Sequence, residues 1–286
     1  MDVIGNFLND IFLAGTEWCM SVFIGVFNGS LGILQTDAAL TPVSFNASVV
    51  AILRGISNTI IMPLAGLLLT YVFCYELITM ITEKNNMAEF DVQGLFWLIM
   101  KTAISITLMT NCFNITLAFF DLGAELVTSA ASPATPSLSL SGIVAALRTD
   151  VGSNVGMGLV VLLFSLLSFL AGIVACGLIY LVSWSRIVII LIYVSVAPIP
   201  FSTFMSNNWL GEIGKNYIKN LMALALQGFL MVVCMIIYGG LVTNVQDVIA
   251  SQGAIMGIVT LLVCMFVCVK SLMSCLSVSK SIFGAQ

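Results

Sequence analysis

Histidine is absent from the 286 residues, and only 8% of them are charged. The missing histidine removes the commonest general base, proton shuttle and zinc ligand together, which excludes most catalytic constellations. An ordinary soluble domain carries roughly 25% charged residues. With 9 Lys+Arg and 13 Asp+Glu, this chain cannot form the charged surface that keeps a globule of its length dispersed in water. Most of the chain must therefore have lipid as its solvent.

Positive charge is also scarce. The formal net charge is -4, and no cluster of Lys or Arg interrupts the apolar runs. Because phosphate contacts need concentrated positive charge, this scarcity argues against nucleic-acid binding as a direct activity.

What the sequence has instead is apolar length, since 60% of its residues are hydrophobic. Runs of about 20 apolar residues are long enough to cross a bilayer as helices, in which every backbone polar group is satisfied. The sequence predicts an all-α integral membrane protein with about six transmembrane helices, within a range of five to seven, preceded by an N-terminal amphipathic helix. Four segments are expected in chain order: an amphipathic or re-entrant segment over 1–35, a first transmembrane hairpin over 36–120, a Ser/Pro-rich polar loop over 121–155, and a bundle of about four helices over 156–286.

Within these segments the predicted spans are 53–81, 95–120, two spans inside 155–205, 217–242 and 255–276. The two spans inside 155–205 are expected to meet at Ser183–Arg186, because Trp184 and Arg186 suit a turn at the headgroup level. Pro198 and Pro200 are expected to end the second of them, since proline cannot continue a helix. A loop over 243–253 is expected to join the last two spans, and 142–150 is expected to form a short helix.

The eight cysteines lie mostly in apolar runs and form no C-x-x-C pair, so they are interpreted as small packing residues. Cys264 and Cys268 lie one helical turn apart without a third ligand, so no metal or other cofactor is predicted. A row of small residues indicates close helix approach, either within the chain or between copies; it comprises Ala171, Gly172, Ala175 and Cys176.

Ionisable residues inside predicted spans are candidate functional residues, because charge in hydrocarbon costs several kcal/mol unless it is paired or hydrated. Glu76 and Lys101 lie one or two turns from helix ends, Arg54 begins the first span and Lys270 lies near the end of the last. The alternative is that these side chains extend to the nearest interface. Lys/Arg counts favour a cytoplasmic C-terminus and place the 121–155 loop on the same side.

The stretch SWSRIVIILIYVSVAPIPFSTF, with Arg186 at its entry, Pro198 and Pro200 at its exit and Trp209 beyond it, resembles a known family. It is similar to the TrbL/VirB-type polytopic inner-membrane subunit of type IV secretion systems, in the short form on mobile elements of Gram-positive bacteria. The order of amphipathic start, hairpin, central loop and apolar C-terminal half matches that family as well.

The resemblance implies a non-enzymatic channel or scaffold subunit of a conjugative DNA-transfer apparatus in a bacterial cell membrane. Implied partners are the other membrane subunits and ATPases of the system, the translocated DNA–protein substrate, lipid, and further copies of the chain. The resemblance also places the central loop outside the cytoplasm, which an odd number of spans after the loop would satisfy.

Two other hypotheses remain open on the residues alone. Glu76 and Lys101 in a multi-span body are compatible with a small-molecule or ion transporter. Asp121 and Glu125, one turn apart, are the nearest approach to a catalytic carboxylate pair, although they fit a solvated helix end better.

Overall fold

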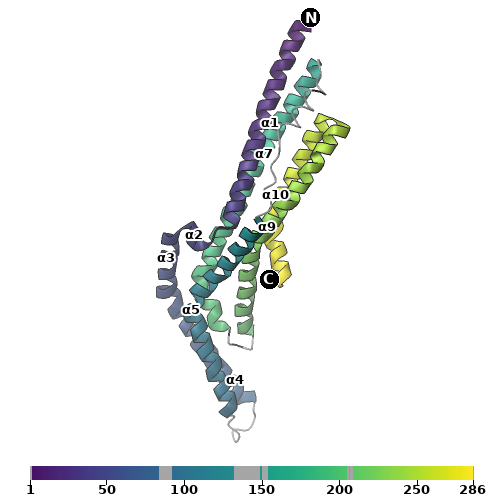
Figure 1. The fold of residues 1–286 in the computed structure, drawn as a ribbon. Coiled ribbons are helices and arrows are strands. Elements are labelled where there is room, and N and C mark those ends of the chain that lie inside the picture. The colour runs from purple at the N-terminus through teal and green to yellow at the C-terminus, as the bar shows by residue number, and fades with distance from the viewer. Residues whose placement is uncertain are drawn as a thin grey trace. The chain divides into compact units, whose positions relative to one another are not determined.

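The computed structural model describes residues 2–83, 92–131, 149, 154–204, 206 and 209–285. In this part of the chain the regular structure is entirely helical (Figure 1). Its elements are α1 (Asp2–Ala38), α2 (Pro42–Phe45), α3 (Ala47–Ile56), the π-helix η1 (Ser57–Ile61), α4 (Met62–Glu83), α5 (Val92–Ala131), α7 (Val155–Val196), α8 (Pro198–Thr203), α9 (Trp209–Gln252) and α10 (Ala254–Phe283).

Six helical segments of the described chain are long and apolar enough to cross a membrane. They are Phe7–Ala38, Ala47–Thr82, Gln93–Ala130, Val155–Val196, Trp209–Leu241 and Ile255–Phe283. The all-α class and the number of six are therefore confirmed. Which segments form the six spans differs from the prediction. The N-terminal segment is itself a candidate span, and 155–205 contains one span instead of two.

The predicted break at Ser183–Arg186 is wrong, since α7 runs without interruption through these residues. None of them is a helix breaker. The Ser185 hydroxyl donates to the Val182 carbonyl oxygen at 3.0 Å, and that of Ser183 donates to Asp37 Oδ2 at 2.7 Å. Both hydroxyl groups thus find acceptors while the helix continues.

The predicted loop over 243–253 is also wrong, because α9 continues to Gln252. Gly253 alone separates α9 from α10, with a φ of 88° that side chains with a Cβ rarely adopt. The short helix predicted over 142–150 lies outside the described residues except at 149. The span predicted over 95–120 is longer than expected, because α5 extends to Ala131.

Proline shapes two helix boundaries. Pro63 follows η1, where the Met62 N–H donates to the Ser57 carbonyl oxygen, five residues back. This wider turn lets α3, η1 and α4 follow one another directly although Pro63 has no N–H to donate. Pro198 lies at the first position of α8, and α7 ends at Val196 as predicted from the prolines.

The described helices form two compact units. Unit 1 comprises 1–39, 127–185 and 229–275, and unit 2 comprises 40–126, 186–228 and 276–286. In unit 1, α1 lies beside the first part of α7 (Figure 1), and its core includes Phe23, Phe27 and Tyr238. The rings of Phe27 and Tyr238 meet edge to face with centroids 5.5 Å apart. Aromatic packing therefore joins α1 to α9 inside this unit.

The predicted close approach at the small-residue row is confirmed, and its partner is a helix of the same chain. A Cβ built on Gly172 would overlap the ring of Phe23 on α1. Ala175 and Cys176 are buried in the same core. A side chain at 172 would force that ring to move, so glycine favours this close approach of α7 to α1.

Candidate functional site

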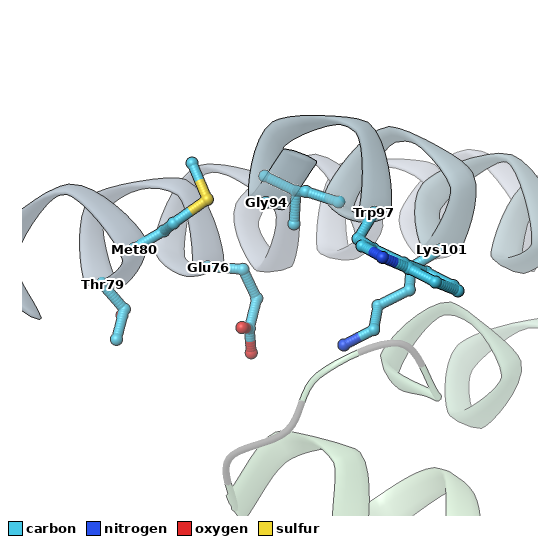
Figure 2. Close-up of a pocket in the computed structure, with 7 residues that line it drawn as sticks. Glu76, Thr79, Met80, Gly94, Trp97 and Lys101 are labelled. Atoms are coloured by element: carbon cyan, nitrogen blue, oxygen red, sulfur yellow. The ribbon is translucent and has the colours of Figure 1, made fainter. Parts of the chain in front are cut away.

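A pocket of about 210 Å³ lies between α4 and α5 in unit 2, inside two candidate spans. Its lining consists of Glu76, Thr79, Met80, Gly94, Trp97, Leu98 and Lys101. Figure 2 shows that Glu76, Thr79 and Lys101 extend to the same side of the helices, whereas Met80 extends to the other. The structure thus brings together the acid and the base that were predicted separately, and gives them one polar pocket.

Glu76 is tied to a third part of unit 2. Its Oε1 accepts a hydrogen bond from the Ser206 hydroxyl at 2.8 Å, across 130 residues of sequence. Ser206 is 2% exposed and lies between α8 and α9. A charge-assisted hydrogen bond of this kind is roughly twice as strong as one between neutral groups. It ties Ser206 to α4.

Arg54 on α3 is also held by a neighbouring helix. Its Nη2 donates to Asn114 Oδ1 on α5 at 2.6 Å, and its guanidinium carbon lies 4.8 Å from the centroid of the Phe113 ring. Two different contacts, one polar and one cation–π, therefore compensate for placing this cation at the head of a span.

Arg186 is 4% exposed and lies inside α7, ten residues before its end. It is not the exposed headgroup-level residue that the predicted turn required. Neighbouring Trp184, by contrast, is 64% exposed. Buried arginine is rare inside membrane segments, and where it occurs it faces protein rather than lipid.

The short helix α8, which begins with Pro198 and is called the proline turn below, packs closely against the start of α9. Pro198 and Pro200 are both buried, and a Cβ built on Gly214 of α9 would lie 2.7 Å from the Pro200 carbonyl oxygen. The Thr203 hydroxyl donates to that same oxygen at 2.9 Å. Trp209, at the first position of α9, is 66% exposed. The prolines are therefore internal to unit 2, whereas Trp209 presents its side chain outward.

Aromatic residues that the sequence did not single out hold this turn in place. The Tyr217 hydroxyl on α9 donates to the Tyr193 carbonyl oxygen on α7 at 2.8 Å. The Tyr217 ring stacks on Tyr193 with centroids 5.7 Å apart, and meets Phe201 of α8 edge to face at 5.8 Å. One side chain thus contacts the helices before and within the proline turn.

Two buried polar residues of α9 were also not identified from the sequence. Asn220 is 7% exposed and its Nδ2 donates to the Asn216 carbonyl oxygen at 2.9 Å. Gln227 is 5% exposed, and its Oε1 accepts no hydrogen bond from the part of the chain that the structure describes. Their spacing of seven residues, two helical turns within an apolar run, is a signal that could have identified them.

Within the described ranges, no three His, Cys, Asp or Glu side chains come together as a metal site. Asp121 and Glu125 are both exposed on α5. The arrangement can hold helices together through polar contacts and can present one pocket with an acid and a base.

Comparison with known proteins gives one finding. The family model described as TrbL/VirB6 plasmid conjugal transfer like protein matches residues 27–198, more than half of the chain. The matched range contains Glu76, Lys101, Arg186 and Pro198, whereas Pro200 and Trp209 lie beyond it. No curated protein and no solved structure matches the chain.

Proposed function

Because the chain belongs to the TrbL/VirB6 plasmid conjugal transfer-like family, and is thus a component of a conjugal transfer system, we propose that it is the channel or scaffold subunit that helps to pass a DNA–protein substrate across the bacterial membrane. The observation that carries the proposal is the match itself, which extends from within α1 to the first residue of α8. Six candidate spans provide the membrane body that such a subunit needs.

The polar contacts of unit 2 support a scaffold. Arg54 binds Asn114 on another helix, and Glu76 accepts from Ser206 between two others. Polar groups inside a membrane bundle pair with one another, and in doing so they fix which helices are neighbours. The residues proposed to matter for assembly or passage are Glu76, Lys101, Arg186, Pro198, Pro200 and Trp209.

The test is an in-frame deletion of the coding region in a donor strain. Conjugal transfer is expected to fall to the detection limit without a change in growth, and a plasmid-borne copy should restore it. Formaldehyde cross-linking followed by immunoprecipitation should recover the transferred DNA strand with the protein. A deletion strain that conjugates normally would overturn the proposal.

The span assignment also supports an orientation. Three candidate spans, α7, α9 and α10, follow the segment between α5 and α7. With three spans after it, that segment would lie on the opposite side of the membrane from the C-terminus, as the resemblance implies. The Lys/Arg counts made on the spans predicted from the sequence had favoured the same side for both.

The distribution of positive charge agrees with this orientation. Six of the nine Lys and Arg residues lie in, or nearer in sequence to, the connections expected on the side of the C-terminus: Lys84, Lys101, Arg186, Lys215, Lys219 and Lys280. Arg54 and Arg148 lie on the other side, and Lys270 is near the middle of α10. Since the side richer in Lys and Arg is normally cytoplasmic, the proposal places the C-terminus in the cytoplasm.

Reporter fusions test the orientation. Green fluorescent protein joined after Gln286 should fluoresce, and alkaline phosphatase inserted after Ser137 should be active, because each reporter works on only one side of the membrane. The reverse pattern would contradict the six-span assignment.

A transporter is the second candidate, favoured by the pocket that Glu76 and Lys101 share. Purified protein in proteoliposomes would then catalyse solute or ion flux that Glu76→Gln reduces. Flux that this substitution leaves unchanged, or no flux at all, would count against transport through the pocket.

A further inference from the structure

Two thiols from different helices of unit 1 face each other. Cys234 Sγ on α9 lies 3.5 Å from Cys275 Sγ on α10, across 41 residues of sequence. Both cysteines are free thiols. A disulfide bond is about 2.05 Å long, so the sulfurs need to approach by only about 1.5 Å, which small side-chain rotations can provide.

The environment holds Cys275 in position for such a bond. Its side chain is 3% exposed, and its thiol donates to the Ser271 carbonyl oxygen at 3.3 Å. It belongs to the main core cluster of unit 1, against which Cys234 packs as a partly buried residue. The pair is therefore pre-arranged by packing rather than formed by chance encounter.

A small pocket gives a reagent access to one of the two sulfurs. It has a volume of about 70 Å³ and is lined by Cys234, Ile237, Tyr238, Leu241, Val267, Cys268 and Ser271. Space of this size accommodates molecules as small as water, and Cys275 is not among the lining residues. A small oxidant would reach Cys234 first, with Cys275 behind it.

We propose that Cys234 and Cys275 form a redox-active pair, in which hydrogen peroxide or another small peroxide oxidises Cys234 and Cys275 then closes a disulfide between α9 and α10. In the first step, the Cys234 thiol and hydrogen peroxide give the sulfenic acid and one water as the O–O bond breaks. In the second, the Cys275 sulfur attacks the sulfenic sulfur, the S–S bond forms, and a second water leaves with the Cys275 proton. Two thiols lose two electrons in total, and one peroxide gains them.

Peptide mapping tests the pair on the full-length protein in detergent or membrane vesicles. After peroxide treatment and blocking of remaining thiols, two of the eight thiols should be lost. Tryptic cleavage at lysine yields the peptide 271–280, in which Cys275 is the single cysteine, and 220–270, which contains Cys234, Cys264 and Cys268. The two peptides should be joined, lighter by two hydrogens, with fragment ions that assign the bond to Cys234.

Three variants test whether the cross-link is specific to Cys234 and Cys275. Cys234→Ser should abolish the cross-link, whereas Cys268→Ser, which changes another thiol of the same pocket, should leave it intact. Cys74→Ser removes an exposed thiol on α4 and should also leave it intact. Unlinked peptides from the treated wild-type protein, or a bond to Cys264 or Cys268, would overturn the proposal. The mapping measures bond formation directly, so its outcome is independent of whether the protein acts in conjugation.

Discussion

Gly123 of α5 lies close to the backbone of α9, and this contact allows a direct test of the packing. A Cβ built on Gly123 of α5 would lie 2.9 Å from the Ala225 carbonyl oxygen, 3.3 Å from its carbonyl carbon and 3.2 Å from its Cβ. Two of these atoms belong to the backbone of α9 and cannot rotate away. Gly123→Ala should therefore push the two helices apart and destabilise unit 2.

The size of the effect is best measured against a matched glycine. Gly66, in α4 of the same unit, has no heavy atom of a neighbouring element within 4 Å of its built Cβ. Alanine is favoured over glycine in a helix by about 1 kcal/mol, and this gain applies to both substitutions. The difference between the two variants therefore isolates the overlap, and added methyl groups in a packed core cost about 1–3 kcal/mol.

Denaturation of the purified variants in mixed micelles, followed by circular dichroism, provides the measurement. The unfolding free energy of Gly123→Ala should fall below that of Gly66→Ala by about 1–3 kcal/mol. A larger residue at 123, such as valine, should widen the difference. Equal stability of the two alanine variants would refute the inferred contact between α5 and α9.

Two further predictions concern single contacts. Tyr217→Phe removes the hydrogen bond to the Tyr193 carbonyl oxygen while keeping the ring, so the unfolding free energy should drop by about 0.5–1.5 kcal/mol in the same assay; an unchanged value would show that this bond contributes nothing. Gly172→Ala should lower stability by about 1–3 kcal/mol relative to Gly177→Ala on the same helix, because only the first meets a neighbouring side chain. A Gly177→Ala protein that is the less stable of the two would contradict the packing of α7 against α1.

Local sequence features predicted much of the fold. Apolar length predicted the number of spans, although it divided 155–205 into two and did not count the N-terminal one. Pro198 marked where α7 ends, because proline acts on its own backbone whatever surrounds it. The break predicted at Ser183–Arg186 was wrong because whether the helix breaks there depends on contacts with distant residues. Polar side chains do not stop a helix when acceptors are available, and the acceptor for Ser183 is Asp37, far away in sequence.

The candidate site was predicted only as separate residues. Glu76 and Lys101 were recognisable as charges in apolar runs, but the sequence did not show that they line one pocket. The sequence did not single out Ser206 or Asn114, because neither residue is charged. Their importance comes from the charged partner that each contacts.

By itself the sequence determined the solvent, the helical class and the family, because composition and apolar length are sums over the chain and need no knowledge of neighbours. Only the tertiary structure decided which helices meet at Gly123, Gly172 and the Cys234–Cys275 pair. Apolar helices can pack against one another in many ways at similar energy, so the choice depends on where small residues and polar pairs coincide on facing surfaces. That coincidence joins positions far apart in the chain, which no local pattern records.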